Sequence, residues 1–168
     1  VNGSTYNIVT YGGGSIGGTG GYKFNKTVNN LTARQFGTWA DTGTAITLGI
    51  SGDTVTWTGA ANGNWTTTAV GSPVNWKNTG GLANTQFLAP HEGIFNDTGA
   101  TSAVEILNAN VSPSSVTFNN SSINYTVSSA GGFGIASGSL TKNGSGTVNL
   151  TTTNTYTGTT SINGGTLQ

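Results

Sequence analysis

The apolar residues of this sequence recur mostly at every second position, in short runs separated by Gly, Asn and Ser. Alternating side chains face opposite sides of a β-strand, and Gly and Asn favour the turns between strands. Gly, Thr, Asn and Ser make up more than half of the 168 residues, and all four are unfavourable in helix interiors. The sequence therefore predicts an all-β fold. The predicted strands are Tyr6–Tyr11, Ala45–Ile50, Thr54–Thr58, Ala103–Leu107, Ser115–Phe118, Ile123–Ser128, Ser139–Lys142, Gly146–Leu150, Thr159–Ile162 and Thr166–Gln168.

Three regions of one continuous unit differ in composition and in the spacing of their predicted strands. Residues 1–55 combine strands with a glycine-rich turn, residues 56–100 are rich in Trp and turn signals, and residues 101–168 carry short strands at regular intervals. Regular spacing of short strands predicts stacked rungs in the last region. A β-sandwich would explain the strand spacing of the first 100 residues equally well.

The C-terminal segment LTKNGSGTVNLTTTNTYTGTTSINGGTLQ resembles the autotransporter-associated β-strand repeat, a passenger-type repeat of large secreted bacterial proteins. The stretch WTGAANGNWTTTAVGSPVNW is similar to sequences that precede such repeats. The resemblance implies a right-handed β-solenoid in an exported or cell-surface protein, with structural or adhesive roles and no common catalytic residues. The matching positions are Leu140, Lys142, Gly144, Gly146, Thr147, Leu150, Asn154, Thr155, Tyr156, Thr157, Gly158, Thr160, Ile162, Gly165, Thr166 and Leu167.

The residue pattern itself agrees with a solenoid. Inward positions of a rung need apolar residues, and turns need Gly or Asn because φ is often positive there. The segments GTVNL and TTSINGGTL supply both kinds. We also expect outward Thr and Asn side chains to stack in ladders along successive rungs.

Charge and sulfur chemistry exclude several classes of function. Only 6% of residues are charged, the formal net charge is zero and there is no Cys. A chain of this kind has no basic surface for nucleic acid, no disulfide and no thiolate metal site. No apolar run is long enough for a membrane span. The composition fits an extracellular or cell-surface protein.

The ionisable residues do not form a recognisable catalytic set. His91 is followed by Glu92, and a paired-carboxylate or calcium site would have to use Asp97, Glu92 and Glu105. The FNDTG loop lacks the alternating acids of a calcium motif, so we expect turn roles, no cofactor and at most an incidental Ca²⁺ ion. An isopeptide bond from Lys142 to an Asn would need a buried acid, and none is evident nearby in sequence. We therefore predict that the protein is not an enzyme.

Trp57, Trp65 and Trp76 admit two interpretations. Set among Asn, Gly and Thr, they could stack against sugars, which would make surface glycans a partner and the protein a carbohydrate-binding or adhesin module. Alternatively they fill the core of a region that has few large aliphatic residues. Core packing is the favoured interpretation.

The two ends of the chain look like halves of one motif. Placing VNG after GGTLQ puts Leu167 and Val1 two residues apart, and therefore on the same face of a strand. We predict self-association through Val1, Asn2, Thr166, Leu167 and Gln168. The predicted function is that of a structural unit that joins copies of itself, or neighbouring repeats, head to tail in an extracellular fibre or surface filament.

Overall fold

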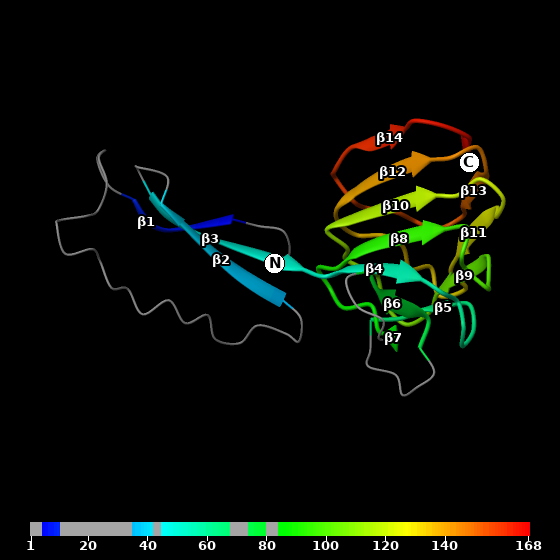
Figure 1. The fold of residues 1–168 in the computed structure, drawn as a ribbon, viewed down its shortest axis with the longest axis horizontal. Coiled ribbons are helices and arrows are strands. Elements are labelled where there is room, and N and C mark those ends of the chain that lie inside the picture. Colours follow the sequence, from blue (N-terminus) through cyan, green and yellow to red (C-terminus); the bar gives the residue numbers. More distant parts are fainter. Residues whose placement is uncertain (1–4, 11–34, 42–44, 68–73, 80–83) are drawn as a thin grey trace.

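The computed structural model describes residues 5–10, 35–41, 45–67, 74–79 and 84–168, and this part of the chain contains strands and no helix. Figure 1 shows a three-stranded sheet that extends away from a stack of shorter strands. The three-stranded sheet is antiparallel, in the order β1-β3-β2. Its strands are β1 (Thr5–Thr10), β2 (Gln35–Asp41) and β3 (Ala45–Gly52).

The stack is a β-solenoid built from two sheets. The long sheet has the order β14-β12-β10-β8-β4-β6-β7, and the short sheet has the order β15-β13-β11-β9-β5. The long sheet comprises β4 (Thr54–Trp57), β6 (Trp76–Asn78), β7 (Asn84–Thr85), β8 (Glu92–Asn96), β10 (Ser115–Asn119), β12 (Ser139–Asn143) and β14 (Thr160–Ile162). The short sheet comprises β5 (Asn64–Trp65), β9 (Ala103–Ile106), β11 (Tyr125–Ser128), β13 (Thr147–Leu150) and β15 (Thr166–Leu167).

Parallel pairing repeats from one rung to the next. Ser115 of β10 pairs with Glu92 of β8 and Ser139 of β12, which lie 23 and 24 residues away along the chain. Because each rung visits both sheets before the chain returns, residues one rung apart become neighbours. Buried residues alternate with more exposed ones along β8 to β12, and the register puts the same face of these strands towards the interior.

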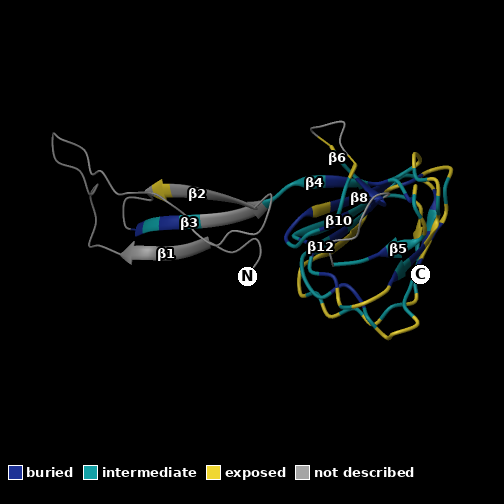
Figure 2. Ribbon diagram, turned by 90° about the horizontal axis from the view of Figure 1, so that it is seen from below, coloured by how far each residue is buried: buried dark blue, intermediate teal, exposed yellow. Residues whose placement is uncertain are grey.

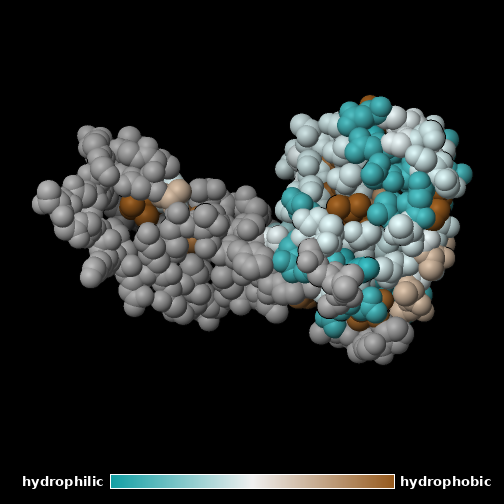
Figure 3. All heavy atoms as spheres, viewed as in Figure 1, coloured by the Kyte–Doolittle hydropathy of each residue, from teal (hydrophilic) through white to brown (hydrophobic). Residues whose placement is uncertain are grey.

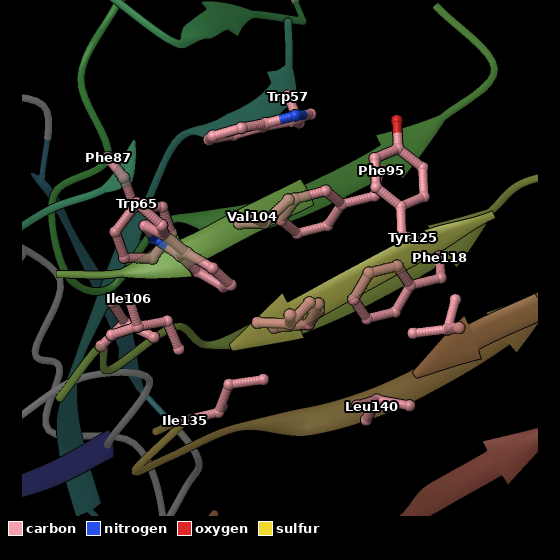
Figure 4. Close-up of a cluster of buried hydrophobic side chains, with 14 of the residues drawn as sticks. Trp57, Trp65, Phe87, Phe95, Val104, Ile106, Phe118, Tyr125, Ile135 and Leu140 are labelled. Atoms are coloured by element: carbon pink, nitrogen blue, oxygen red, sulfur yellow. The ribbon is translucent and has the colours of Figure 1, made fainter. Parts of the chain in front are cut away.

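The core lies between the two sheets (Figures 2 and 4). Figure 2 views the stack end-on, with buried residues on the strands and many exposed residues in the turns. Phe95 of β8 and Phe118 of β10 stack at 4.7 Å between ring centroids, and Tyr125 of β11 packs against both rings. Val104, Val116, Val127, Leu140 and Val148 are also buried. Successive rungs therefore share one continuous apolar interior.

The outer face of the solenoid is polar, as predicted. Figure 3 shows mainly hydrophilic and neutral residues on the side of the stack that faces the viewer. Asn96, Asn119 and Asn143 are neighbours at the ends of β8, β10 and β12, and the Nδ2 of Asn163 donates to the Oδ1 of Asn143 at 2.9 Å. Asn residues of successive rungs are therefore neighbours, as expected, and one pair of them is hydrogen-bonded.

The all-β solenoid is confirmed, and each predicted strand corresponds to an observed one within a few residues. The sequence-based prediction misses five observed strands: β2, β5, β6, β7 and β8. In β8 the inward position before Phe95 is Gly93, where an added Cβ would lie 3.4 Å from Cη2 of Trp76. A glycine that makes room for a tryptophan interrupts the apolar alternation, which explains why this strand was not predicted.

The β-sandwich alternative for the first 100 residues is not what the described residues form. Strands β4 and β5 belong to the same two sheets as the C-terminal strands, since β4 pairs in parallel with β8 and β5 with β9. The solenoid therefore begins near Thr54, inside the region that the sequence suggested could be a sandwich.

Candidate functional site

The two ends of the solenoid are the most distinctive surfaces of this chain. We call strands β14 and β15 with the turn between them the open end. Each of these strands is the outermost strand of its sheet in the described structure. β14 pairs with β12, and β15 pairs with β13, both in parallel. Their other edges carry the main-chain groups to which a further strand would pair.

Apolar side chains are incompletely covered at the open end. Ile162 is 54% exposed, whereas Phe118, two rungs below it in the same inward column, is fully buried. Leu167, Tyr156 and Leu150 pack against the core but remain partly exposed. The interior of the solenoid thus reaches the surface at this end.

No charged side chain protects the open end. Residues 143–168 contain no Asp, Glu, Lys or Arg, and no Pro. Exposed edge strands usually carry charges, prolines or bulges that discourage pairing with other chains. The pairing of β14 with β12 and of β15 with β13 shows no shift in register. The open end therefore lacks the usual protection.

The opposite end of the long sheet is covered. Strand β6 pairs antiparallel with β4, and the two-residue strand β7 pairs antiparallel with β6. Five rings, which we call the aromatic cap, lie behind this hairpin with centroids 5.1 to 5.6 Å apart. They belong to Trp57, Trp65, Trp76, Phe87 and Phe95, and all are at most 2% exposed.

The predicted self-association residues fall partly at the open end. Thr166 and Leu167 form β15, and Gln168 continues that strand's pairing, because its amide donates to the Val148 carbonyl at 2.9 Å. Val1 and Asn2 lie outside the described residues. The predicted pairing between the two termini therefore stays a prediction.

The three tryptophans proposed as candidate glycan platforms lie in the aromatic cap. Trp57 and Trp65 are fully buried and Trp76 is 2% exposed, as core packing predicts. Figure 4 shows Trp57 and Trp65 among the other core side chains. Indole Nε1 of Trp57 donates to the Thr101 carbonyl at 2.8 Å. A sugar that stacks on an indole needs an exposed ring face, and these rings offer none in this conformation.

His91 and Glu92 do not share a site. His91 is fully buried, and its Nδ1 accepts a hydrogen bond from the amide of Leu88 at 3.1 Å. Glu92 is exposed, and its Oε2 accepts from the hydroxyl of Thr54 at 2.8 Å. His91 directly precedes β8 and lies inside the protein, whereas Glu92 begins the strand with its side chain exposed, so the imidazole and the carboxylate lie in different environments.

Asp97 binds the next rung. Its carboxylate accepts hydrogen bonds from the amides of Ser121, Ser122 and Ile123 at 2.9 to 3.0 Å. These amide bonds hold the pKa of Asp97 below its usual value of 3.8. The carboxylate therefore fastens one turn of the solenoid to the turn above it. Glu105 makes a similar but weaker contact, accepting from the amide of Ala130 at 3.4 Å.

The described residues contain no cluster of three or more His, Cys, Asp or Glu side chains arranged to hold a metal ion. In the same part of the chain, no helix has the length and hydropathy needed to cross a membrane. Tyr125, beside Asp97, is a hydrogen-bond donor in the core, with its hydroxyl 2.6 Å from the Asn96 carbonyl. Burial raises the pKa of Tyr125 to about 12, so the phenol keeps its proton at neutral pH.

The structural feature that sequence reasoning missed is the buried ammonium of Lys142. Its side chain is fully buried on the inward face of β12. The alternation in SLTKN, which points Leu140 and Lys142 the same way, is the signal that could have placed it inside.

Comparison with known proteins supports the sequence resemblance. Residues 140–168 match the family model described as passenger-associated-transport-repeat. Neither the search of curated proteins nor that of solved structures gave a match to this chain. The matched segment covers β12 to β15, which include the open end. The segment from β12 to β15 of this β-solenoid is therefore similar to a passenger-associated-transport-repeat.

Proposed function

We propose that this protein is a structural unit of an extracellular or cell-surface β-solenoid, and that it associates head to tail through its open end in a fibre or filament. The observation that carries the proposal is the uncharged parallel edge of β14 and β15, on which Ile162 stays 54% exposed. The passenger-type repeat at the same end supports a role outside the cell.

The chemistry of the association is strand addition. A docking strand gains main-chain hydrogen bonds along β14 and β15, and its alternate side chains cover the exposed apolar surface. In a parallel ladder, every second residue of a strand donates its amide to one neighbouring strand, and the residues between them point their amides to the opposite edge. The amide of Asn163 faces β12, since it donates to the Lys142 carbonyl at 2.8 Å. The amide of Ile162 therefore faces the open edge.

The asymmetry of the solenoid gives the association a direction. A docking strand cannot add to β4, because β6 and β8 already pair with its two edges. The open end accepts a rung from a following repeat or from a neighbouring copy. The near-zero net charge does not oppose such contacts. A contact between two different surfaces propagates as a filament instead of closing into a dimer.

This proposal assigns no catalytic role to the chain. The carboxylates of Glu92, Asp97 and Glu105 each accept a hydrogen bond from another segment. These contacts hold turns and strands together, which is the role of polar groups in a scaffold.

A single charge at the open end tests the proposal. Ile162→Lys places an ammonium on the docking edge, whereas Leu107→Lys places one at another exposed apolar residue, 44% exposed, away from the open end. Light scattering and negative-stain microscopy of the full chain at rising concentration measure the association. We expect Ile162→Lys to abolish it and Leu107→Lys to leave it intact. Equal association of both variants and the parent, or a monomeric parent at high concentration, would refute the proposal.

A further inference from the structure

A charged side chain interrupts an otherwise apolar column inside the solenoid. Register pairing places Phe95, Phe118, Lys142 and Ile162 one above another on β8, β10, β12 and β14. The first two rings stack, and Ile162 ends the column at the surface. Lys142 occupies the third position and is fully buried. A charge in this place needs a specific role, because removing an ammonium from water is costly.

The ammonium of Lys142 is held by main-chain carbonyls. Its Nζ donates to the carbonyls of Asn143 at 2.6 Å, Gly144 at 2.9 Å and Gly164 at 3.3 Å. An ammonium has three hydrogens to donate, so the three acceptors match its capacity. Asn143 is the last residue of β12 and Gly144 begins the turn after it, whereas Gly164 belongs to the turn that follows β14. One side chain thus joins the turns of two successive rungs.

The turn after β14 is shaped to receive this ammonium. Gly165 has a φ of +69°, and a Cβ added there would meet the main-chain carbonyls of Gly146 and Gly144 and would also lie 2.7 Å from the Nζ of Lys142. Any other residue at this position would intrude on the ammonium as well as strain the backbone. The lysine and the glycine pair Gly164–Gly165 both lie within the matched repeat, so one repeat contains both partners of the contact.

Hydrophobic alternation alone does not fix the placement of the last rung. Shifting β14 by one residue would turn Ile162 outward, but shifting it by two would keep the same residues facing inward. The inward positions of β14 are Thr160 and Ile162, which are both exposed, so neither is a buried ring that could fix the register. A two-residue shift would, however, move the Gly164 carbonyl away from Lys142 and leave the ammonium with an unmet donor.

We propose that Lys142 is a positioning residue that sets the register of β14 and β15 on the rung below, through its contact with the Gly164–Gly165 turn. Buried polar groups often contribute little net stability while excluding alternative pairings, as buried Asn does in coiled coils. Burial lowers the pKa of Lys142 and Asp97 acts in the opposite direction. The role concerns rungs within one chain and does not depend on association between chains.

The substitution Lys142→Met separates register from stability. Methionine has a similar length and is apolar, so it fills the column without the carbonyl contacts. We expect the melting temperature of the full chain to stay within a few degrees of the parent or to rise. Amide exchange at Asn163, Thr166 and Gln168 should accelerate by about tenfold or more, while exchange within β10 stays unchanged. These three amides donate to the rung below.

Lys77→Met is the matched control, because Lys77 is partly exposed on β6 at the other end of the solenoid. It should leave exchange at the last rung as in the parent. Unchanged exchange at all three amides in Lys142→Met would overturn the proposal. Faster exchange in β10 to the same extent would also overturn it, because that result indicates general destabilisation.

Amine labelling of the unmodified protein tests the contact without any substitution, and so covers the case in which Lys142→Met does not fold. Under native conditions an acylating reagent should modify Lys142 at least about tenfold more slowly than Lys77, because a buried ammonium is released only by local opening. Peptide mass spectrometry reads both sites in one sample. Equal rates at Lys142 and Lys77 would show that the ammonium is not enclosed and would refute the proposal.

Discussion

The aromatic cap and the open end stabilise opposite ends of one solenoid in different ways. At the cap, large rings fill the interior and an antiparallel hairpin covers the edge of the long sheet. At the open end the rungs consist mostly of Thr, Ser, Asn and Gly, and the interior reaches the surface at Ile162. The edge of β4 is therefore already paired, whereas β14 and β15 are the outermost strands of their sheets in the described structure.

If the proposed association holds, this solenoid restricts where it grows through strand topology and ring packing, without charged residues at the docking edge. Lys77 is the charged residue of the β6–β7 hairpin, and residues 143–168 have none. Reversal of strand direction at β6 is sufficient to prevent parallel addition to β4, because that edge is already paired. Repeat proteins generally need such a cap at an end that does not continue.

The largest expected effect is at the cap. Trp76→Ala removes a ring that contacts Trp57, Trp65, Phe87 and Phe95. It should lower the free energy of unfolding by about 3–5 kcal/mol, because the neighbouring rings cannot collapse into the cavity. Chemical denaturation measures this loss. The matched change at the open end, Leu167→Ala, should cost less than about 2 kcal/mol, because that side chain is only partly buried. Equal losses would show that the two ends do not differ in packing.

An intermediate effect on stability is expected at Asp97, which joins two rungs between the two ends of the solenoid. The pKa of Asp97 is lowered by amides of the next turn, so the folded state binds its proton less readily than the unfolded state. Its contribution is present above pH 3.8 and is lost as the pH falls through the lower folded pKa. Asp97→Asn should therefore be less stable than the parent at neutral pH and approach it in acid. A stability difference that is the same at neutral pH and below pH 3 would contradict this assignment.

The smallest expected effect on folding is at the docking edge itself. Ile162→Lys should change the unfolding free energy of the isolated chain by no more than about 0.5 kcal/mol, because the side chain is more than half exposed. Thermal unfolding at low protein concentration measures it. A large loss of unfolding free energy would mean that Ile162 supports the fold. Reduced association of Ile162→Lys could then result from unfolding and would not test docking.

The sequence predicted the regular rungs well because their alternation is uninterrupted. In β10, the buried Val116 and Phe118 alternate with the more exposed Ser115, Thr117 and Asn119. The glycine and asparagine turns and the neighbouring Asn residues of successive rungs followed from the same repeat. Local pattern was sufficient where the alternation is not interrupted, including in β14 and β15 at the end of the stack, and it failed at Gly93 in β8.

The cap could not be predicted in the same way, because its elements depend on distant contacts. Strands β5, β6 and β7 have two or three residues each, which is too short for a periodic signal. β6 becomes a strand through antiparallel pairing with β4, and Trp76 is accommodated by Gly93 on β8. Lys142 was missed for a different reason, since hydropathy places a lysine outside although the alternation of its strand points inward.

Hydrogen exchange at a single amide tests most directly whether the open end is a docking edge. The amide of Ile162 faces the open edge, whereas the amide of Thr117 lies in β10, between two paired strands. As protein concentration rises into the range where association is measured, we expect exchange at Ile162 to slow by about tenfold or more while exchange at Thr117 stays constant. Association without any protection of Ile162 would place the contact elsewhere and contradict the account.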